Sequence, residues 1–403
     1  MRVSRLSETL VKPTDARRTH LPRLDGVRGC AILLVILSHV AGPVTPLGTL
    51  DRVTVTVFGA GWIGVDLFFV LSGFLISGIL LDSRDDPRYL GTFFARRALR
   101  ILPPYVLFLI GLTVATAWLR PTPAWDGWLA SLPWHLTYLT NLLVALHGWN
   151  AAAMQSGHLW SLAVEDQFYL TWPFVVRVGG TRRLRAWIER SLLYLPALRG
   201  LALAAGAVTV VVHALTPFRF DSLIAGALLA IAVRSDDERL RRQLRRAGYC
   251  AAAALLVIVA ARRGLPYNDP WVQTLGYSAL AILFASLIES LLRDGDRSLG
   301  GRVFGSRVLR SFGRYSYAIY LFHAPLLLVA DHLGWARDAL PAVGGSRTPA
   351  LLIYSAMFSA GMWLVGLASW WAYERRFLAL KRHFRYERDT RTLPEQVPRP
   401  QAA

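Results

Sequence analysis

The chain of 403 residues is 54% hydrophobic and only 18% charged, and its net charge is +19. Since charged residues make up about a quarter of an ordinary soluble domain, this composition excludes such a domain and indicates a protein that crosses a membrane several times. The Arg and Lys residues occur in bursts between apolar segments, which is typical of cytoplasmic loops, so no nucleic-acid partner is expected.

Ten apolar stretches approach the length of about 20 residues that crosses a bilayer. In chain order they cover residues 27–45, 63–81, 101–119, 159–177, 192–214, 220–234, 247–262, 271–291, 315–332 and 350–373. A Trp-rich stretch, 124–147, is interpreted as an interfacial helix with aromatic anchors. The sequence therefore predicts an all-α bundle of about ten transmembrane helices, with the lipid bilayer as its surroundings.

The basic residues predict the orientation of this bundle. With the N-terminus inside, the predicted cytoplasmic segments contain 35 Lys and Arg residues, whereas the predicted outer loops contain seven. Those seven are Arg52, Arg120, Arg219, Arg262, Arg263, Arg337 and Arg347. Because short cytoplasmic loops are enriched in Lys and Arg, both termini are expected in the cytoplasm of a bacterial cell, with the chain in its inner (plasma) membrane.

The predicted helices divide the chain into three parts. Residues 1–23 are predicted to form a basic cytoplasmic tail, residues 24–377 the membrane domain, and residues 378–403 a cytoplasmic C-terminal tail. The tail after the last apolar stretch is charged and then Pro-rich, and it is too short for a second domain.

The first apolar stretch, "LDGVRGCAILLVILSHV", carries Arg28 at its mouth and His39 in its middle. Eleven residues are about three helical turns, so both side chains are expected on one face. An unpaired charge at the bilayer centre costs roughly 3 kcal/mol, and histidine can accept a proton from a hydroxyl near neutral pH. His39 is therefore a candidate catalytic group. The alternative is an arginine that anchors the helix end beside a hydrogen-bonded histidine.

A second motif, "FFARRALRILPPY", places Arg97 and Arg100 three residues apart on one helical face. Guanidinium groups suit bidentate phosphate binding, as a phosphate-bearing acyl carrier such as coenzyme A would require. The alternative is that these arginines only set the topology of the third apolar stretch.

The remaining candidates are polar residues inside apolar stretches. Asp66 lies one turn inside the outer end of the second stretch, where a carboxylate is costly without a partner. In "GHLWSLAVEDQFYLTWP", His158 and Trp160 lie at the outer boundary, and Glu165 begins three consecutive polar residues that cannot share one helix face. His323 lies in the middle of the ninth stretch, where a hydrogen-bonded core histidine is the alternative.

Taken together, these motifs resemble the membrane-bound acyltransferase-3 family over residues 24–377. The family's arginine and histidine with ten residues between them match Arg28 and His39, and its arginine pair matches Arg97 and Arg100. Two acidic positions of the family match the remaining carboxylates, Asp66 and Glu165. Asp166 and Phe322 replace the glutamate and tryptophan that are common in the family at those positions.

The resemblance implies an integral-membrane O-acyltransferase that moves an acyl group, expected to be acetyl, from acyl-CoA to a hydroxyl of a carbohydrate or glycan. His39 would act as general base or carry the acyl group covalently, and Asp66 or Glu165 would orient the imidazole or bind the acceptor. The expected site residues are His39, Glu165 and Asp66 for catalysis, Arg28, Arg97 and Arg100 for the donor, and Trp160, His158 and His323 for the acceptor. No metal and no permanently bound cofactor is expected.

Two other functions stay open from the sequence. Compact members of this family also acylate macrolides or other secondary metabolites, so such a small molecule is an alternative acceptor. A membrane transporter would also place polar residues along a pathway inside the bundle. The chain shows no inverted repeat, and its phosphate-suited arginines favour the enzyme.

Overall fold

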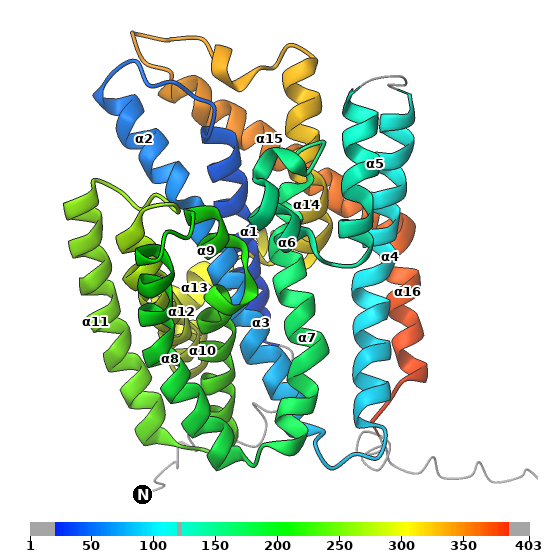
Figure 1. Ribbon diagram of the computed structural model, residues 1–403, viewed down its shortest axis with the longest axis vertical. Helices are drawn as coiled ribbons and strands as arrows, with labels where there is room; N and C mark the ends of the chain where they lie inside the picture. Colours follow the sequence, from blue (N-terminus) through cyan, green and yellow to red (C-terminus); the bar gives the residue numbers. More distant parts are fainter. Residues whose placement is uncertain (1–20, 119–122, 387–403) are drawn as a thin grey trace, which may run out of the picture.

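The computed structural model describes residues 21–118 and 123–386, and it confirms the prediction of an all-α bundle (Figure 1). In this part of the chain no β-strand forms beyond one isolated bridge between Val343 and Ser346. The helices are α1 (Pro22–Ala41), α2 (Thr49–Gly59), α3 (Ile63–Asp82), α4 (Tyr89–Ala117), α5 (Pro123–Leu136), α6 (Thr140–His147), α7 (Trp160–Val178), α8 (Thr181–Ala204), α9 (Thr209–Ala214), α10 (Thr216–Arg234), α11 (Glu238–Arg262), α12 (Tyr277–Asp294), α13 (Leu299–Phe304), α14 (Arg307–His332), α15 (Thr348–Ser369) and α16 (Arg375–Ala379).

Seven helical segments within the described residues are long and apolar enough to cross a membrane. They are Pro22–Ala41, Thr49–Asp82, Tyr89–Ala117, Thr209–Arg234, Glu238–Arg262, Val272–Asp294 and Thr348–His383. Helices α7, α8 and α14 are also long, with 19, 24 and 26 residues, but they are not among these seven. The chain is therefore a multi-pass membrane protein, whereas ten crossings and two cytoplasmic termini remain predictions. Most of both predicted tails, and Arg120, lie outside the described residues.

Close helix packing puts α1 and α3 at the centre of the bundle, where α1 packs on α14 and α3 packs on α10 (Figure 1). A Cβ atom at Gly313 of α14 would lie 1.7 Å from the carbonyl oxygen of Asp25 in α1. A Cβ atom at Gly226 of α10 would lie 2.0 Å from the carbonyl oxygen of Val70 in α3. Small residues at these contacts let the helix backbones approach each other, as is common in membrane bundles.

The Trp-rich stretch 124–147 corrects the prediction of one interfacial helix. It forms two helices, α5 and α6, joined at Tyr138, whose φ of 54° is left-handed. Trp128 and His135 are fully buried in this hairpin, and their rings stack with centroids 5.4 Å apart. His135 also contacts Thr140 through Nδ1 at 2.8 Å, so its polar atoms are bonded within the protein. An interfacial position for this stretch stays a prediction.

Two arginines assigned to outer loops are buried in the structure. Arg219 belongs to α10 and is 0% exposed, and Arg337 is 5% exposed. Each is ion-paired, Arg219 with Asp66 at 2.8 Å and Arg337 with Asp331 at 2.6 Å. Counting basic residues alone does not distinguish an arginine in an exposed loop from a buried arginine that a carboxylate neutralises.

Candidate active site

Two cavities inside the bundle collect most of the predicted site residues. The first, here called the arginine cavity, is lined by Arg28, Arg97 and Arg100, together with Glu165. The second, here called the histidine cavity, is lined by His39, His158 and Trp160. Within residues 21–118 and 123–386, no cluster of three or more His, Cys, Asp or Glu side chains is arranged to hold a metal ion.

The arginine cavity brings together all three arginines predicted to bind the donor. Arg28 comes from the second turn of α1, whereas Arg97 and Arg100 come from one face of α4, as their spacing predicts. The cavity has a volume of about 90 Å³, which is below the range of about 300–1,000 Å³ found for small-molecule sites. Two acidic residues, Glu165 and Asp166, also line it, so cationic groups outnumber anionic ones.

The cationic groups of this cavity are only partly neutralised by the protein. Arg28 donates from Nη1 to Oδ1 of Asp25 at 3.0 Å. Arg97 lies over the ring of Tyr169, with Cζ 5.2 Å from the ring centroid. Among the described residues neither Arg97 nor Arg100 forms an ion pair, so both can bind an anion that enters the cavity.

Glu165 lies with the arginines and not beside His39. Its Oε1 accepts hydrogen bonds from the hydroxyls of Ser72 on α3 and Tyr169 on α7. The structure therefore does not support the expectation that Glu165 orients the imidazole of His39, and a catalytic role for this carboxylate stays a prediction.

His39 lies in the last turn of α1 and not at its middle, because the helix begins at Pro22 and ends at Ala41. It also lines a different cavity from Arg28, so the two side chains do not share one site as the sequence suggested. The carbonyl oxygen of His39 accepts a hydrogen bond of 2.5 Å from Nη1 of Arg337. This arginine thereby satisfies an unpaired carbonyl at the helix C-terminus.

The imidazole of His39 is held in one tautomer. Its Nδ1 lies 2.9 Å from the carbonyl oxygen of Val35, and since a carbonyl only accepts, Nδ1 carries the proton and donates it. Within the described part of the chain Nε2 has no hydrogen-bond partner, which leaves its lone pair available to accept a proton. Histidine can thus act as a base at this position.

His323 lies against His39, and His158 lies against His323. The His39 and His323 rings have centroids 4.8 Å apart at an angle of 84°, and the His158 and His323 rings have centroids 5.0 Å apart. His323 is fully buried, and its Nδ1 donates to the carbonyl oxygen of Tyr320 at 2.7 Å. The structure therefore brings His39, His158 and His323 together from α1, the turn before α7 and the middle of α14.

A thin wall separates the two cavities, since Val65 of α3 and Tyr320 of α14 line both. The hydroxyl of Tyr320 donates to the carbonyl oxygen of His158 at 2.9 Å and lies 2.5 Å from Oγ of Ser161. Any group that passes from the arginines to His39 must pass these side chains.

Asp66 does not line either cavity. It is fully buried, and both of its carboxylate oxygens lie 2.8 Å from Nη2 of Arg219. Oγ of Ser222 donates to Oδ1 at 2.8 Å. Both oxygens of this carboxylate are therefore bonded to side chains of α10, which indicates that Asp66 positions α3 against α10.

Sequence reasoning missed several residues of the histidine cavity, namely His213 of α9, Trp149 and Tyr267, and it missed Tyr320 in the wall. His213 lies in an apolar stretch, and the rule that drew attention to His39 applied to it equally. Trp149 lies in a three-residue helical turn and Tyr267 in a loop, where no spacing pattern indicates which cavity a ring joins.

Comparison with known proteins gives the following relatives. A family model described as an acyltransferase domain matches residues 21–372. The putative peptidoglycan O-acetyltransferase YrhL of Bacillus subtilis is 28% identical over 77% of this chain and 49% of its own length. The peptidoglycan O-acetyltransferase OatA of Listeria monocytogenes is 25% identical over 78% of this chain and 51% of its own length. The chain thus spans about half the length of these relatives. No solved structure matches it.

Proposed function

This chain belongs to the acyltransferase-3 family of membrane proteins, and on that premise we propose that it is an O-acyltransferase that moves an acetyl group from acetyl-CoA to a hydroxyl of a glycan. One observation carries the proposal. A cavity with three arginines meets a cavity with a proton-accepting histidine, His39, at a wall of two side chains, Val65 and Tyr320. Acyl transfer requires such an arrangement, because the acyl carrier is held by its phosphates in one cavity and the acceptor is held beside a base in the other.

The arginine cavity is the donor site in this proposal. Coenzyme A carries several phosphate charges, and Arg97 and Arg100 are free of ion pairs within the described residues. Guanidinium groups bind phosphate through two parallel hydrogen bonds, which favours arginine over other cations here. Arg28 adds a third charge to the lining of the cavity, from α1.

His39 is the general base in this proposal. Its Nε2 accepts the proton of the acceptor hydroxyl while the hydroxyl oxygen attacks the carbonyl carbon of the thioester. A carbon–oxygen bond forms and the carbon–sulfur bond breaks, so coenzyme A leaves as a thiolate and takes the proton from His39. The hydrogen bond from Nδ1 to the carbonyl oxygen of Val35 keeps the lone pair on Nε2 throughout. The thioester reaches His39 past Val65 and Tyr320.

A glycan is the acceptor that the relatives favour. Two of them are named as peptidoglycan O-acetyltransferases. The histidine cavity has a volume of about 570 Å³, which lies within the range of about 300–1,000 Å³ found for small-molecule sites. This volume accommodates a sugar unit.

The test is acetyl transfer by the purified protein in lipid vesicles, with labelled acetyl-CoA and a soluble glycan fragment. We expect release of coenzyme A together with an acetyl ester on the glycan. Arg97→Ala and Arg100→Ala should raise the KM for acetyl-CoA, whereas Arg96→Ala is the matched control because its Nη1 donates to the carbonyl oxygen of Phe384 outside the cavity. A protein that releases no coenzyme A under any of these conditions contradicts the proposal and supports the transporter alternative.

A further inference from the structure

Five aromatic rings gather on one side of the histidine cavity, with His213 at their centre. The centroid of the His213 ring lies 4.6 Å from that of Trp160, 4.7 Å from Tyr267, 5.8 Å from Trp149 and 6.2 Å from Trp62. All five line the cavity that also contains His39. They come from five separate segments, so the cluster is a product of the fold and not of one amphipathic helix.

Two of these rings are more exposed than the others. Trp62 and Trp160 are buried, at 9% and 5% exposure, whereas Trp149 and Tyr267 are half-buried. The Trp149 and Tyr267 rings have centroids 6.2 Å apart, and their planes meet at 85°. They therefore form a corner of two aromatic faces, supported from behind by the buried rings.

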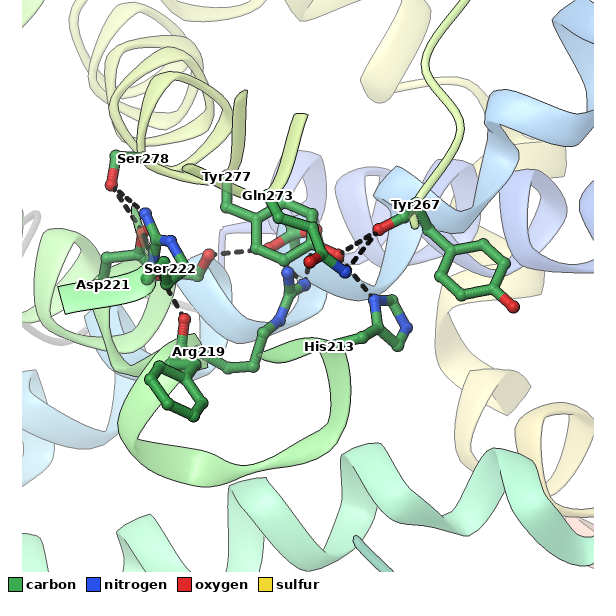
Figure 2. A network of polar contacts seen from close by, with 11 residues as sticks. His213, Arg219, Asp221, Ser222, Tyr267, Gln273, Tyr277 and Ser278 are labelled. Carbon is green, nitrogen blue, oxygen red and sulfur yellow. Dashed lines mark hydrogen bonds and ion pairs between the residues drawn. The ribbon is translucent and has the colours of Figure 1, made fainter. Parts of the chain in front are cut away.

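The ring nitrogens of His213 have fixed hydrogen-bonding roles in the same corner. The hydroxyl of Tyr277 donates its only proton to the carbonyl oxygen of Tyr267 at 2.7 Å. Nδ1 of His213, 2.7 Å from that hydroxyl, must therefore be the donor of their hydrogen bond. In the described part of the chain Nε2 of His213 has no hydrogen-bond partner, so it presents a lone pair (Figure 2).

Hydrogen bonds and a cation–π contact support the residues around His213. Nε2 of Gln273 donates to the carbonyl oxygen of Tyr267 at 3.0 Å (Figure 2). It also donates to the carbonyl oxygen of Thr209 at 2.8 Å, and so ties the loop before α12 to the start of α9. The guanidinium group of Arg219 lies 3.8 Å from the centroid of the Tyr277 ring. A binding group whose supporting hydrogen bonds are already made loses little entropy when a ligand arrives.

We propose that the corner formed by Trp149, Tyr267 and His213 is the acceptor subsite and that it binds a pyranose ring. One face of a pyranose carries C–H groups and packs on an aromatic ring, while the hydroxyls around its edge donate hydrogen bonds. Nε2 of His213 accepts one of these hydrogen bonds, and another hydroxyl of the same sugar faces His39. An acyclic polyol has the hydroxyls but no flat apolar face, so this corner discriminates against it.

This inference rests on the proposed function and adds the acceptor class and the residues that hold it. The test measures acetyl transfer to a panel of methyl pyranosides with gluco, galacto, manno and N-acetylgluco configuration, and to sorbitol and glycerol as acyclic polyols. Release of coenzyme A without any acceptor is measured in parallel, because it reports the donor site and the thioester chemistry alone.

We expect at least one pyranoside to be acetylated with a kcat/KM about tenfold or more above that of sorbitol. Trp149→Ala and Tyr267→Ala should raise the KM for that pyranoside about tenfold while kcat at saturation changes little, since they remove binding and not chemistry. His213→Phe keeps an aromatic ring but loses the Nε2 acceptor, so it should also raise the KM about tenfold with little change in kcat. Trp335→Ala, a change of an exposed Trp that does not line the cavity, is the control and should leave the KM unchanged.

Three results overturn the inference. They are equal acetylation of sorbitol and of every pyranoside, acetylation of none of the pyranosides, and an unchanged KM in all three variants. In each case normal release of coenzyme A without acceptor shows that the donor site works and that only the pyranose subsite is wrong. If His213→Phe lowers the melting temperature, the inference is tested by comparing Trp149→Phe with Trp149→Ala, because Trp149 is more exposed. Trp149→Phe should recover most of the affinity for the pyranoside that Trp149→Ala loses.

Discussion

The hydroxyl of Tyr320 donates a hydrogen bond of 2.9 Å to the carbonyl oxygen of His158 at the wall between the two cavities. This bond ties α14 to the turn before α7 and fixes the phenol ring between the three arginines and the three histidines. In the proposed reaction the thioester must pass this ring and the side chain of Val65, so the wall controls transfer without contacting the phosphates of the donor.

A larger side chain in the wall should block transfer and spare donor binding. Val65→Phe adds volume where the two cavities meet, so we expect acetyl transfer to fall about tenfold or more while the dissociation constant for acetyl-CoA changes little. Equilibrium binding and single-turnover transfer measure the two quantities. Val65→Ala is the control and should not slow transfer. Normal transfer by a stably folded Val65→Phe protein would show that the wall is not on the path.

Substitution of Arg100 should weaken the reaction only with donors that carry phosphate. Arg100→Ala should raise the KM for acetyl-CoA, because a lost charge-assisted hydrogen bond costs about 1.5–3 kcal/mol. The same variant should leave the reaction with S-acetylpantetheine, which has no phosphate, unchanged. Steady-state kinetics of both proteins with both donors form a double-mutant cycle. Equal losses with the two donors would mean that Arg100 supports the structure and not the phosphates.

Asp66 should prove to be important for stability. Asp66→Asn leaves the guanidinium group of Arg219 buried without its counter-charge, which costs about 3–5 kcal/mol in such pairs. We expect a clear fall in the melting temperature of the purified protein, and partial recovery when Asp66→Leu is combined with Arg219→Met. An Asp66→Asn protein of normal stability but without activity would instead support the catalytic role suggested by the sequence.

The contact between α1 and α14 should tolerate no side chain at Gly313. A Cβ atom there would lie 1.7 Å from the carbonyl oxygen of Asp25, so Gly313→Ala forces the helices apart. We expect a lower yield of folded protein and a lower melting temperature, measured in detergent. Gly361→Ala in α15 is the control, since nothing lies within 4 Å of a Cβ atom at that position. Equal melting temperatures for the two variants would contradict the close packing.

Local features of the fold and of the donor site could be predicted from the sequence. Apolar stretches of the right length indicated the helices, and the spacing of Arg97 and Arg100 placed both on one face of α4, where the structure has them. His39 lies nearer the end of its helix than the sequence predicted, because the predicted apolar stretch covers residues 27–45, whereas α1 begins at Pro22 and ends before Gly42 and Pro43. The helix end could have been inferred from that Gly-Pro pair.

Contacts between distant segments could not be predicted. Asp66 and Arg219 are 153 residues apart, and nothing in either segment identifies the other as its partner. The corner at His213 is formed by residues of α9, of the short helix at Trp149 and of the loop at Tyr267, which meet only after the long helices have packed. Tertiary packing brings these segments together, and neither hydrophobic periodicity nor residue spacing in the sequence specifies that packing.

The central claim is that His39 accepts the proton of the acceptor hydroxyl, and single-turnover acetyl transfer by His39→Ala tests it most directly. The matched control is His332→Ala, since Nδ1 of His332 makes the same kind of hydrogen bond, 2.8 Å to the carbonyl oxygen of Leu328, at an exposed position outside the cavity. We predict a fall of about a hundredfold or more for His39→Ala, with unchanged acetyl-CoA binding and a normal rate for His332→Ala. Near-normal transfer by a folded His39→Ala protein would contradict the account.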